Sequence, residues 1–388
     1  MKLLIITSRV PWPLDKGDKL RIYHQIRYLS KTYEIELIAL SSNSNNDIAI
    51  AELSKYCGKI NFLHINRLAS FLGVVNAFFG NRPLQIGYFY NSNTNNKIQK
   101  IIAESKADFV FGQLIRVAEY IRYTKIHKVL DLQDAFSKGL ERRAAKAKGF
   151  RKFILNIEYR RMLAYEENEL DDFGGLSIIT QADKDLLPLR IQERTLIVPN
   201  GVDFDFFKKQ DSQKKYDIVF TGNMNYAPNI MAAIFLVKDI MPLVWKKYEK
   251  VRVLLAGASP HASVKALRGD RVVVSGWIDD IRDAYSESEI FVAPMQIGIG
   301  LQNKLLEAMA MEMPCVTSEL ANQALKAIDG KQVLISENND AGLFAEQIIK
   351  LITDKNLAEK IAKEGHSFVK DNYDWESAVD QLGTLFVK

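Results

Sequence analysis

The chain alternates between short unbroken apolar runs and stretches whose apolar residues recur at helical spacing. The first example is an apolar run at residues 3–7, then apolar side chains at Ile22, Ile26 and Leu29, then a second run at residues 35–40. An unbroken apolar run is typical of a strand buried on both faces, as in parallel sheets covered by helices. A strand, a helix and a strand in this order predict a parallel βαβ unit.

The alternation forms two series separated by a polar segment. The first series ends with the run at residues 196–198, and the second begins with the run at residues 216–222. Between them the chain turns and loses its periodicity, which is typical of a domain linker. Since 388 residues also suit two domains, the sequence predicts two doubly wound, parallel-sheet (Rossmann-like) α/β domains. We expect the first at residues 1–204, the second at residues 205–372, and a helix at residues 373–388 that crosses back onto the first.

Charge and composition narrow the class of function. The chain has 52 lysines and arginines against 47 aspartates and glutamates, and a net charge of +5 is weak for a nucleic-acid-binding protein. Its two cysteines, Cys57 and Cys315, are too few for a disulfide framework or a thiolate metal cluster. The sequence has neither a signal-peptide pattern nor a run of 18 apolar residues. We therefore expect a cytoplasmic protein without a nucleic-acid partner.

Common cofactor and metal motifs are missing from the sequence. No dinucleotide glycine fingerprint follows the first apolar run, and no P-loop or metalloprotease motif occurs. The five histidines show no spacing typical of metal ligands. The only Asp-x-Asp motif, at residues 203–205, is interpreted as a turn and cap. The sequence therefore predicts no bound metal and no cofactor.

Five stretches, in the same order along the chain, resemble the family 4 glycosyltransferases. They are residues 11–21, 198–207, 220–224, 298–311 and 373–375. Enzymes of this family have the two-domain GT-B fold and use nucleotide sugars, and the chain is most similar to the bacterial branch associated with exopolysaccharide assembly. The resemblance covers essentially the whole chain. It implies a metal-independent hexosyltransferase that moves a sugar, with retention of configuration, from a UDP-type or GDP-type donor to a glycan or lipid-linked acceptor.

The donor site is expected where a glycine loop leads from the apolar run at residues 290–293 into a helix. Glycines allow close backbone approach, and a helix N-terminus carries partial positive charge that favours a diphosphate. Lys304 adds a full charge there, and the resemblance implies that Glu307 accepts hydrogen bonds from ribose hydroxyls. The expected donor-binding residues are Gly222, Asn223, Gly298, Gly300, Leu301, Asn303, Lys304 and Glu307. The alternative is a glycine loop that only packs strand against helix, with Lys304 in solvent.

The sequence departs from the family pattern at two places. The first acid of the family's Glu-x7-Glu motif corresponds to Ile299, which is apolar. The Arg and Lys residues that follow the second domain's first strand in the family are replaced by Asn223, Asn225 and Asn229. Lys304 is therefore the candidate for the missing positive charge against the diphosphate.

The acceptor side is expected in the first domain. The acceptor or phosphate loop consists of Arg9, Gly17, Asp18 and Arg21, where backbone amides and arginines can meet an anion. Many relatives carry a His-Asp pair after a first-domain strand, whereas this chain has Gln133 and Asp134, and glutamine cannot act as a base. Asp134 and Lys304 are the candidate catalytic residues. As alternatives, Asp134 caps the following helix and Arg21 is a solvated helix residue.

Positive charge is concentrated in one helical segment. Residues 142–161 carry eight lysines and arginines against one acid, Glu158, with aromatic and aliphatic residues interleaved. One hypothesis is peripheral contact with an anionic membrane at its inner face. The other is a solvated helix whose charge is balanced by the acids at residues 166–172.

Two other functions stay open at the level of sequence. A GT-B-type nucleotide-sugar epimerase shares the two-domain layout and would convert the donor without an acceptor. A non-catalytic nucleotide-sugar-binding protein would fit the apolar Ile299 and the missing cations.

Overall fold

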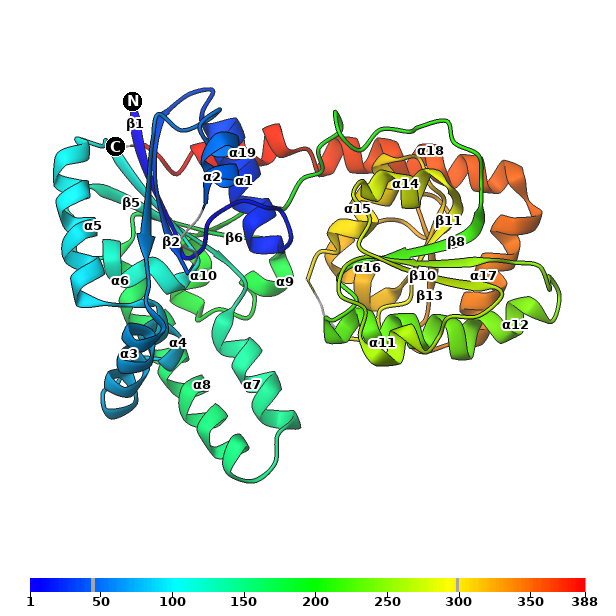
Figure 1. Ribbon diagram of the computed structural model, residues 1–388, viewed down its shortest axis with the longest axis horizontal. Coiled ribbons are helices and arrows are strands. Elements are labelled where there is room, and N and C mark those ends of the chain that lie inside the picture. Colours follow the sequence, from blue (N-terminus) through cyan, green and yellow to red (C-terminus); the bar gives the residue numbers. More distant parts are fainter. Residues whose placement is uncertain (43–45, 298–299, 388) are drawn as a thin grey trace. The chain divides into compact units, whose positions relative to one another are not determined.

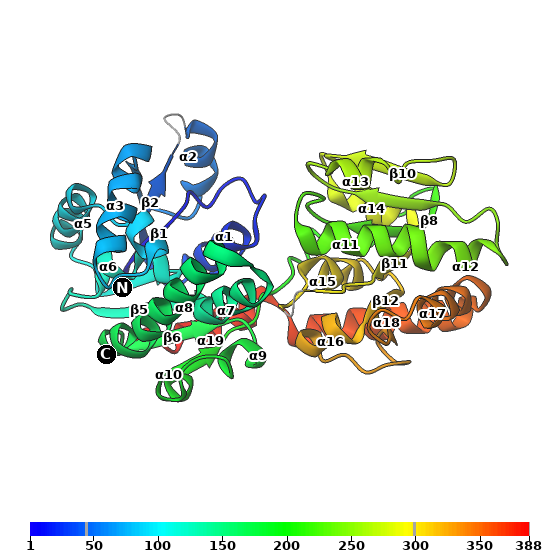
Figure 2. The same cartoon turned by 90° about the horizontal axis from the view of Figure 1, so that it is seen from below.

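The computed structural model describes residues 1–42, 46–297 and 300–387. They form two compact units, the first made of Met1–Pro199 with Trp375–Lys388 and the second of Asn200–Asp374. Figures 1 and 2 show each unit as a twisted sheet with helices on both faces. The predicted architecture of two doubly wound parallel sheets is confirmed.

The first unit is built on a sheet of seven parallel strands in the order β3-β2-β1-β4-β5-β6-β7. The strands are β1 (Lys2–Thr7), β2 (Glu34–Ser41), β3 (Lys59–His64), β4 (Phe109–Gln113), β5 (His127–Gln133), β6 (Gly175–Ile178) and β7 (Thr195–Ile197). Because the strands are parallel, their carboxyl ends lie at one edge, and the strand order reverses between β1 and β4. Ligands of open α/β sheets bind outside this edge at such a reversal.

Helices cover both faces of this sheet. They are α1 (Gly17–Leu29), α2 (Asp47–Leu53), α3 (Arg67–Phe79), α4 (Leu84–Phe89), α5 (Ser92–Ser105), α6 (Ala118–Ile121), α7 (Phe136–Lys146), α8 (Gly149–Glu169), α9 (Gln181–Lys184), α10 (Leu189–Arg194) and α19 (Trp375–Gly383). Leu4 and Ile6 of β1 belong to one buried core, and Leu3 and Ile5 belong to another. Alternate residues of the strand therefore serve the two faces. Helices α7 and α8 form a hairpin that projects from the sheet (Figure 1).

The last helix of the chain completes the first unit. The Trp375 side chain of α19 is buried and stacks on the His24 ring, with 4.9 Å between the centroids. Glu376 forms an ion pair with Lys31 at 2.5 Å. These contacts join the C-terminal segment to α1.

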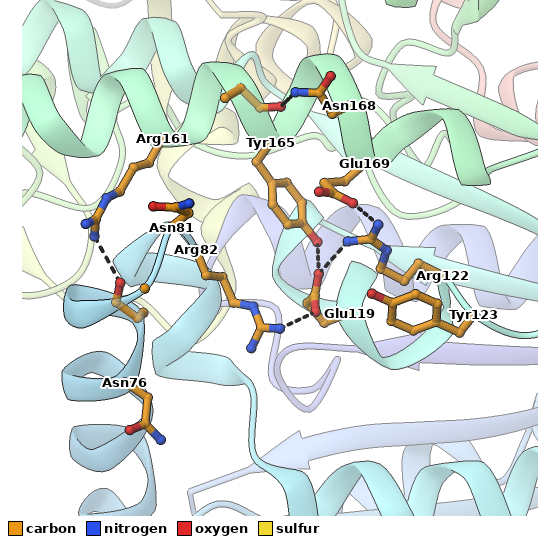
Figure 3. Close-up of a pocket in the computed structure, with 13 residues that line it drawn as sticks. Asn76, Asn81, Arg82, Glu119, Arg122, Tyr123, Arg161, Tyr165, Asn168 and Glu169 are labelled. Carbon is orange, nitrogen blue, oxygen red and sulfur yellow. Dashed lines mark hydrogen bonds and ion pairs between the residues drawn. The ribbon is translucent and has the colours of Figure 1, made fainter.

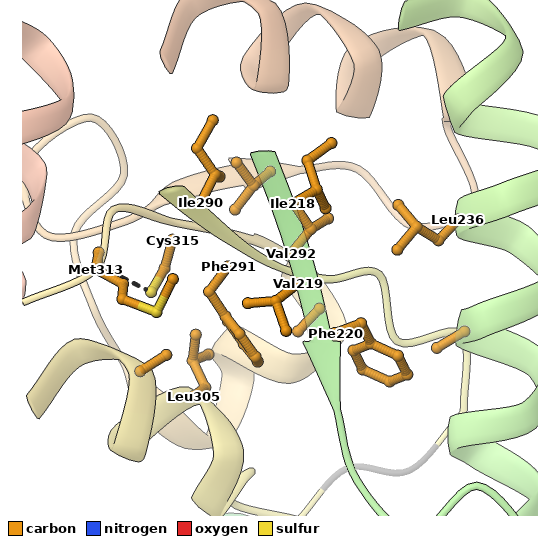
Figure 4. Close-up of a cluster of buried hydrophobic side chains, with 14 of the residues drawn as sticks. Ile218, Val219, Phe220, Leu236, Ile290, Phe291, Val292, Leu305, Met313 and Cys315 are labelled. Carbon is orange, nitrogen blue, oxygen red and sulfur yellow. Dashed lines mark hydrogen bonds between the residues drawn. The ribbon is translucent and has the colours of Figure 1, made fainter. Parts of the chain in front are cut away.

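The second unit has a sheet of six parallel strands in the order β10-β9-β8-β11-β12-β13. The strands are β8 (Tyr216–Thr221), β9 (Val253–Ala256), β10 (Val272–Gly276), β11 (Ser288–Ala293), β12 (Cys315–Ser318) and β13 (Leu334–Ser336). The helices are α11 (Ala227–Phe235), α12 (Met241–Trp245), α13 (Ala262–Lys265), α14 (Ile281–Ser286), α15 (Asn303–Ala310), α16 (Glu319–Leu325), α17 (Ala341–Thr353) and α18 (Lys355–Asn372). Figure 4 shows its core, in which side chains of β8 and β11 pack with Leu236, Leu305 and Cys315.

One helical run of the second unit is long and apolar enough, by composition alone, to cross a membrane. It extends over Ala227–Trp245 and joins α11 to α12 through a π-helical turn. Leu236, Ile240 and Val244 are fully buried in the core of the second unit. This run is therefore a core element of the α/β fold.

The boundary between the units lies five residues before the expected one, between Pro199 and Asn200. The backbone N–H of Val202 donates to the carbonyl of Tyr373 at 2.8 Å, and the Val202 side chain is buried in the second core. Hydrophobic contacts and a backbone hydrogen bond thus assign this stretch to the second unit, although its composition resembles a linker.

A buried ion pair lies under the carboxyl edge of the first sheet. Arg21 donates from Nε to Asp131 Oδ2 at 2.7 Å and from Nη2 to Asp131 Oδ1 at 2.8 Å, and neither side chain is exposed. Ser177 Oγ donates to the same carboxylate at 2.7 Å. A buried charge pair is tolerated only when good geometry and hydrogen bonds offset the loss of hydration, and this bidentate pair has both.

Replacing Arg21 with methionine is expected to lower the free energy of unfolding by about 3–5 kcal/mol, because it leaves the Asp131 carboxylate buried and uncompensated. Urea unfolding followed by circular dichroism measures the change. Lys31→Met is the matched control, since it breaks an exposed pair and should cost less than about 1 kcal/mol. An Arg21→Met protein as stable as this control would contradict a structural role for the buried pair.

Candidate functional site

In the second unit, Lys304 lies in the first turn of α15 and brings three segments together. Its Nζ donates to Asn229 Oδ1 of α11 and lies 4.8 Å from the centroid of the Phe220 ring at the end of β8. A Cβ built on Gly222 would lie 3.4 Å from the same Nζ. The alternative of a solvated Lys304 is therefore wrong, and its ammonium lies at the carboxyl end of β8.

Two glycines at this edge have backbone conformations that other residues rarely adopt. Gly222, with φ +148°, follows β8, and Gly257, with φ +139°, follows β9. A Cβ on Gly257 would lie 1.9 Å from the Gly222 carbonyl oxygen, and a Cβ on Gly222 would lie 2.6 Å from Asn229 Nδ2. Only glycine permits this close approach of the two loops. The approach places the Gly222 loop against Lys304.

Burial controls the electrostatics of Lys304 and Glu307. Burial lowers the pKa of the Lys304 ammonium to about 7, while the nearby Glu307 carboxylate acts in the opposite direction. Burial also raises the pKa of Glu307, and hydrogen bonding from Tyr285 opposes that rise. The charged form of such a poorly solvated ammonium is stabilised by any ligand that brings negative charge close to it.

Tyr285, on α14, holds Glu307 in place. Its hydroxyl donates to Glu307 Oε2 at 2.7 Å and shares a hydrogen bond of 2.9 Å with Thr221 Oγ1. Tyr285 is fully buried. The sequence prediction missed this residue, because it precedes Glu307 by more than twenty positions and belongs to no recognisable motif.

The remaining donor candidates have structural contacts of their own. Asn223 is exposed, and its carbonyl accepts from Asn229 Nδ2 at 2.9 Å. Asn303 Oδ1, at the first position of α15, accepts from Asn200 Nδ2 at 3.1 Å. These contacts fix the loop after β8 and the start of α15.

The glycine loop before α15 is described only in part. The Gly300 carbonyl accepts from Gln302 Nε2 at 2.8 Å, and Leu301 packs on the second core. Gly298 and Ile299 lie outside the described residues. The described part leads directly into the N-terminus of α15, whose N-cap residue, Gln302, makes no side-chain capping bond.

In the first unit, charged side chains gather at the carboxyl edge of the sheet. Arg9, which follows β1, donates from Nη1 to Asp18 Oδ2 at 2.6 Å. Gln113, at the end of β4, donates to the Asp18 carbonyl at 2.6 Å. Gly17 begins α1 and is exposed, with no atom within 4 Å of a Cβ built on it. The structure thus brings Arg9, Gly17 and Asp18 together.

Arg21 does not join this group. The sequence placed it either in the acceptor loop or in solvent, but it is fully buried in the ion pair with Asp131. Its guanidinium points into the interior and reaches Asp131 of β5. A residue without exposed surface cannot contact an acceptor, so the expectation for Arg21 is corrected.

Asp134, after β5, has an exposed side chain, although many protein atoms lie nearby. Burial, followed by the charge of Asp183, raises the pKa of its carboxyl to about 6. The alternative that Asp134 caps α7 is wrong, because the N-cap is Ala135 and makes no side-chain bond. Glu166 Oε1 instead accepts from the Ser137 N–H at 3.1 Å.

Two further residues mark this edge. Gln133 has φ +64° and is 6% exposed, and its Nε2 is buried without a partner among the described residues. Such backbone strain is frequent at functional sites. Arg116, which the sequence prediction missed, lies near Arg9, and burial together with this neighbour lowers its pKa to about 10. No sequence motif marks Arg116.

The structure also has two pockets, one in each unit. One of about 540 Å³ lies in the first unit between α3, α6 and α8 (Figure 3). At its floor, Glu119 accepts from Tyr165 at 2.8 Å and pairs with Arg82 at 2.9 Å and Arg122 at 3.1 Å. The other, of about 410 Å³, lies in the second unit beside Tyr285 and α18. Among the described residues, no three His, Cys, Asp or Glu side chains are placed to hold a metal.

Comparison with known sequences assigns the second unit to a family. The family model of the group 1 glycosyl transferases matches residues 215–354. An uncharacterized 44.6 kDa protein in the cps region of Klebsiella pneumoniae is 22% identical, with 96% of each chain covered. The capsular polysaccharide biosynthesis glycosyltransferase CapM of Staphylococcus aureus is 23% identical over 48% of this chain and 52% of its own.

Solved structures share the fold over the whole chain. Sucrose-phosphate synthase of Thermosynechococcus elongatus superposes with a TM-score of 0.72 at 15% identity, covering 100% of this chain and 98% of that one. Anabaena Alr3699/HepE, in complex with UDP-glucose, gives a TM-score of 0.70 at 12% identity, with 99% of both chains covered. The second unit thus matches the group 1 glycosyl transferases by sequence, and the chain as a whole has the two-domain GT-B fold of glycosyltransferases.

Proposed function

We propose that this glycosyltransferase moves a hexose from a nucleotide-sugar donor to a glycan or lipid-linked acceptor, with retention of configuration, in the biosynthesis of a polysaccharide. The observation that carries the proposal is Lys304, partly buried beside the Gly222 loop at the N-terminus of α15. CapM, which has a capsular polysaccharide function, and HepE, solved with UDP-glucose, support the acceptor and donor classes.

The donor diphosphate is proposed to bind at the N-terminus of α15. As the bond from the anomeric carbon to the diphosphate breaks, negative charge grows on the leaving oxygen. Lys304 and the helix N-terminus stabilise that charge without a metal. Because burial leaves the free ammonium poorly solvated, its interaction with the diphosphate strengthens as the charge grows.

Glu307 is proposed to accept hydrogen bonds from the ribose hydroxyls, as the family resemblance implies. The Tyr285 hydroxyl fixes one carboxylate oxygen at 2.7 Å and so orients the group. Tyr285 is a positioning residue in this proposal.

On the acceptor side, Asp134 is proposed to orient the attacking hydroxyl or to take its proton. A carboxyl with a pKa near 6 is suited to proton transfer close to neutral pH. Arg9, Asp18 and Arg116 surround the same sheet edge and can bind the polar groups of an acceptor.

We further propose that the enzyme works in the cytoplasm, at the inner face of a membrane. The α7–α8 hairpin exposes seven basic side chains: Arg142, Arg143, Lys146, Lys148, Arg151, Lys152 and Arg160. Such a cluster is attracted to anionic lipid. It would bring the first unit to a lipid-linked acceptor.

Lys304→Ala is expected to lower kcat by about 10²–10³-fold, because it removes the charge that stabilises the leaving diphosphate. Glu307→Gln is expected to weaken donor affinity by about 10-fold or more, through loss of a hydrogen bond to a charged group. Initial rates of nucleotide release measure both effects. Lys246→Ala, at an exposed lysine of the same unit, is the control. Control-like rates in Lys304→Ala would remove the donor-site assignment.

The pH profile of kcat/KM is expected to be bell-shaped with a maximum between about pH 6 and 7. Activity rises as the Asp134 carboxylate forms through its pKa of about 6, and it falls as the Lys304 ammonium is lost above its pKa of about 7. Asp134→Asn should flatten the acidic limb and leave the alkaline limb in place. An unchanged acidic limb in that variant would show that another group titrates there.

Incubation with a panel of UDP-sugars and GDP-sugars tests the activity itself. Slow release of nucleotide without acceptor, accelerated by glycan acceptors and insensitive to EDTA, is expected for a metal-independent transferase. Proton NMR of the anomeric centre should show retention. A changed sugar without nucleotide release would instead establish an epimerase, and binding without turnover would establish a non-catalytic protein.

A further inference from the structure

Helix α3 exposes its large apolar side chains and buries its small ones. Leu68 and Phe71 are each 63% exposed, and Phe79 is 84% exposed. Ser70 and Ala77 are each 4% exposed. This is the reverse of an ordinary surface helix, whose large apolar residues face the core.

Close helix packing explains which face is buried. A Cβ on Gly73 of α3 would lie 2.2 Å from the Gly87 carbonyl oxygen of α4, and a Cβ on Gly87 would lie 2.5 Å from the Ala77 Cβ. Ser70, Gly73 and Ala77 follow one another at helical spacing. The small residues therefore form the contact face, and the large apolar residues must point away from α4.

The basic helix α8 lies directly against the end of α3. Arg161 donates from Nη1 to the Ala77 carbonyl at 2.9 Å and from Nη2 to the Phe78 carbonyl at 3.0 Å. Figure 3 shows Arg161 reaching from α8 to the last turn of α3. Helix α8 itself exposes Phe150 by 77% and Phe153 by 61% among its lysines and arginines. The apolar face of α3 is thus attached to a strongly basic surface.

We propose that α3 is an interfacial membrane anchor, whose exposed apolar face inserts at the boundary of headgroups and acyl chains in an anionic bilayer while α7 and α8 contact lipid phosphates. The inference rests on the membrane contact proposed above and names the element that enters the lipid. Figure 1 shows α3 and the α7–α8 hairpin extending from the same part of the first unit.

The length and ends of α3 fit this placement. Thirteen residues give a helix of about 20 Å, too short to cross a hydrocarbon core of about 30 Å, so the helix lies in the interface. No charged residue occurs from Leu68 to Asn81, and arginines flank the stretch at positions 67 and 82. Arginines at such ends can extend to the headgroups.

A bilayer fits this surface better than a second copy of the chain. Two copies joined through α3 by a twofold axis would bring their basic α8 helices towards each other. Anionic lipid neutralises the same charges, and acyl chains accept the apolar side chains.

Co-sedimentation with vesicles tests the anchor. The protein is expected to bind phosphatidylcholine vesicles that contain 30% phosphatidylglycerol, and the double variant Phe71→Ser with Phe79→Ser is expected to bind about 10-fold more weakly or worse. Ile328→Ser, which removes a 57% exposed apolar side chain in the second unit, should bind as the wild type does. Nucleotide release is measured for each protein as a check of folding, and should be unchanged.

The insertion of α3 into the bilayer is tested with the variant Phe79→Trp in vesicles that contain brominated acyl chains. These chains should quench the tryptophan fluorescence of the variant more than that of the wild type. If the double variant still binds vesicles in a salt-sensitive manner, and brominated lipid does not quench Phe79→Trp, α3 is not an anchor. The basic side chains of α7 and α8 would then be the only membrane contact. Absence of vesicle binding would overturn both membrane proposals without affecting transferase activity. Dimers that the double variant dissociates, with no vesicle binding, would identify α3 as a contact between copies.

Discussion

The architecture depends on parallel strands that are buried on both faces. Residues of β1 alternate between two cores, so the side chains in the middle of the strand pack against helices and are not available to a ligand. Polar chemistry is left to the loops where the strands end, and parallel pairing places all of these ends at one edge. Arg9 follows β1 and Asp134 follows β5 in the first unit, while Gly222 follows β8 in the second.

Two basic residues near the N-termini of helices show how the surroundings of a buried charge decide its role. Arg21 of α1 is buried with a bidentate carboxylate partner, so its charge is already satisfied. Lys304 of α15 is surrounded by an amide oxygen, an aromatic ring and glycine backbone, which solvate an ammonium less well than water does. The first arrangement stabilises the fold, whereas the second leaves electrostatic energy to be gained when an anion arrives.

The sequence predicted both sheets because unbroken apolar runs have few alternatives in a chain of this composition. It also predicted that Lys304 and Glu307 lie at the start of the helix after the glycine loop, and that Arg9 and Asp18 belong to an acceptor-side loop. It could not predict the partner of Arg21, since Asp131 lies 110 residues away and only the sheet brings them together. Tyr285 and Arg116 were missed for the same reason: their importance comes from neighbours that are distant along the chain. The unit boundary was misplaced because Val202 makes its contacts with Tyr373 and the core of the second unit, which lie later in the chain.

Helix α3 shows where hydrophobicity alone is ambiguous. An apolar helix of thirteen residues whose only charge is its first residue, Arg67, is most simply interpreted as a core helix, and the sequence does not state which face a neighbour covers. The deciding residue lies on α4, because Gly87 allows a backbone approach that only the small side of α3 can meet. Because α4 covers the small side chains of α3, the aromatic side chains of α3 must face outward. The outward face, the basic α8 helix and Asp134 all belong to the first unit, so the unit proposed to bind the acceptor also carries the surface proposed to contact lipid.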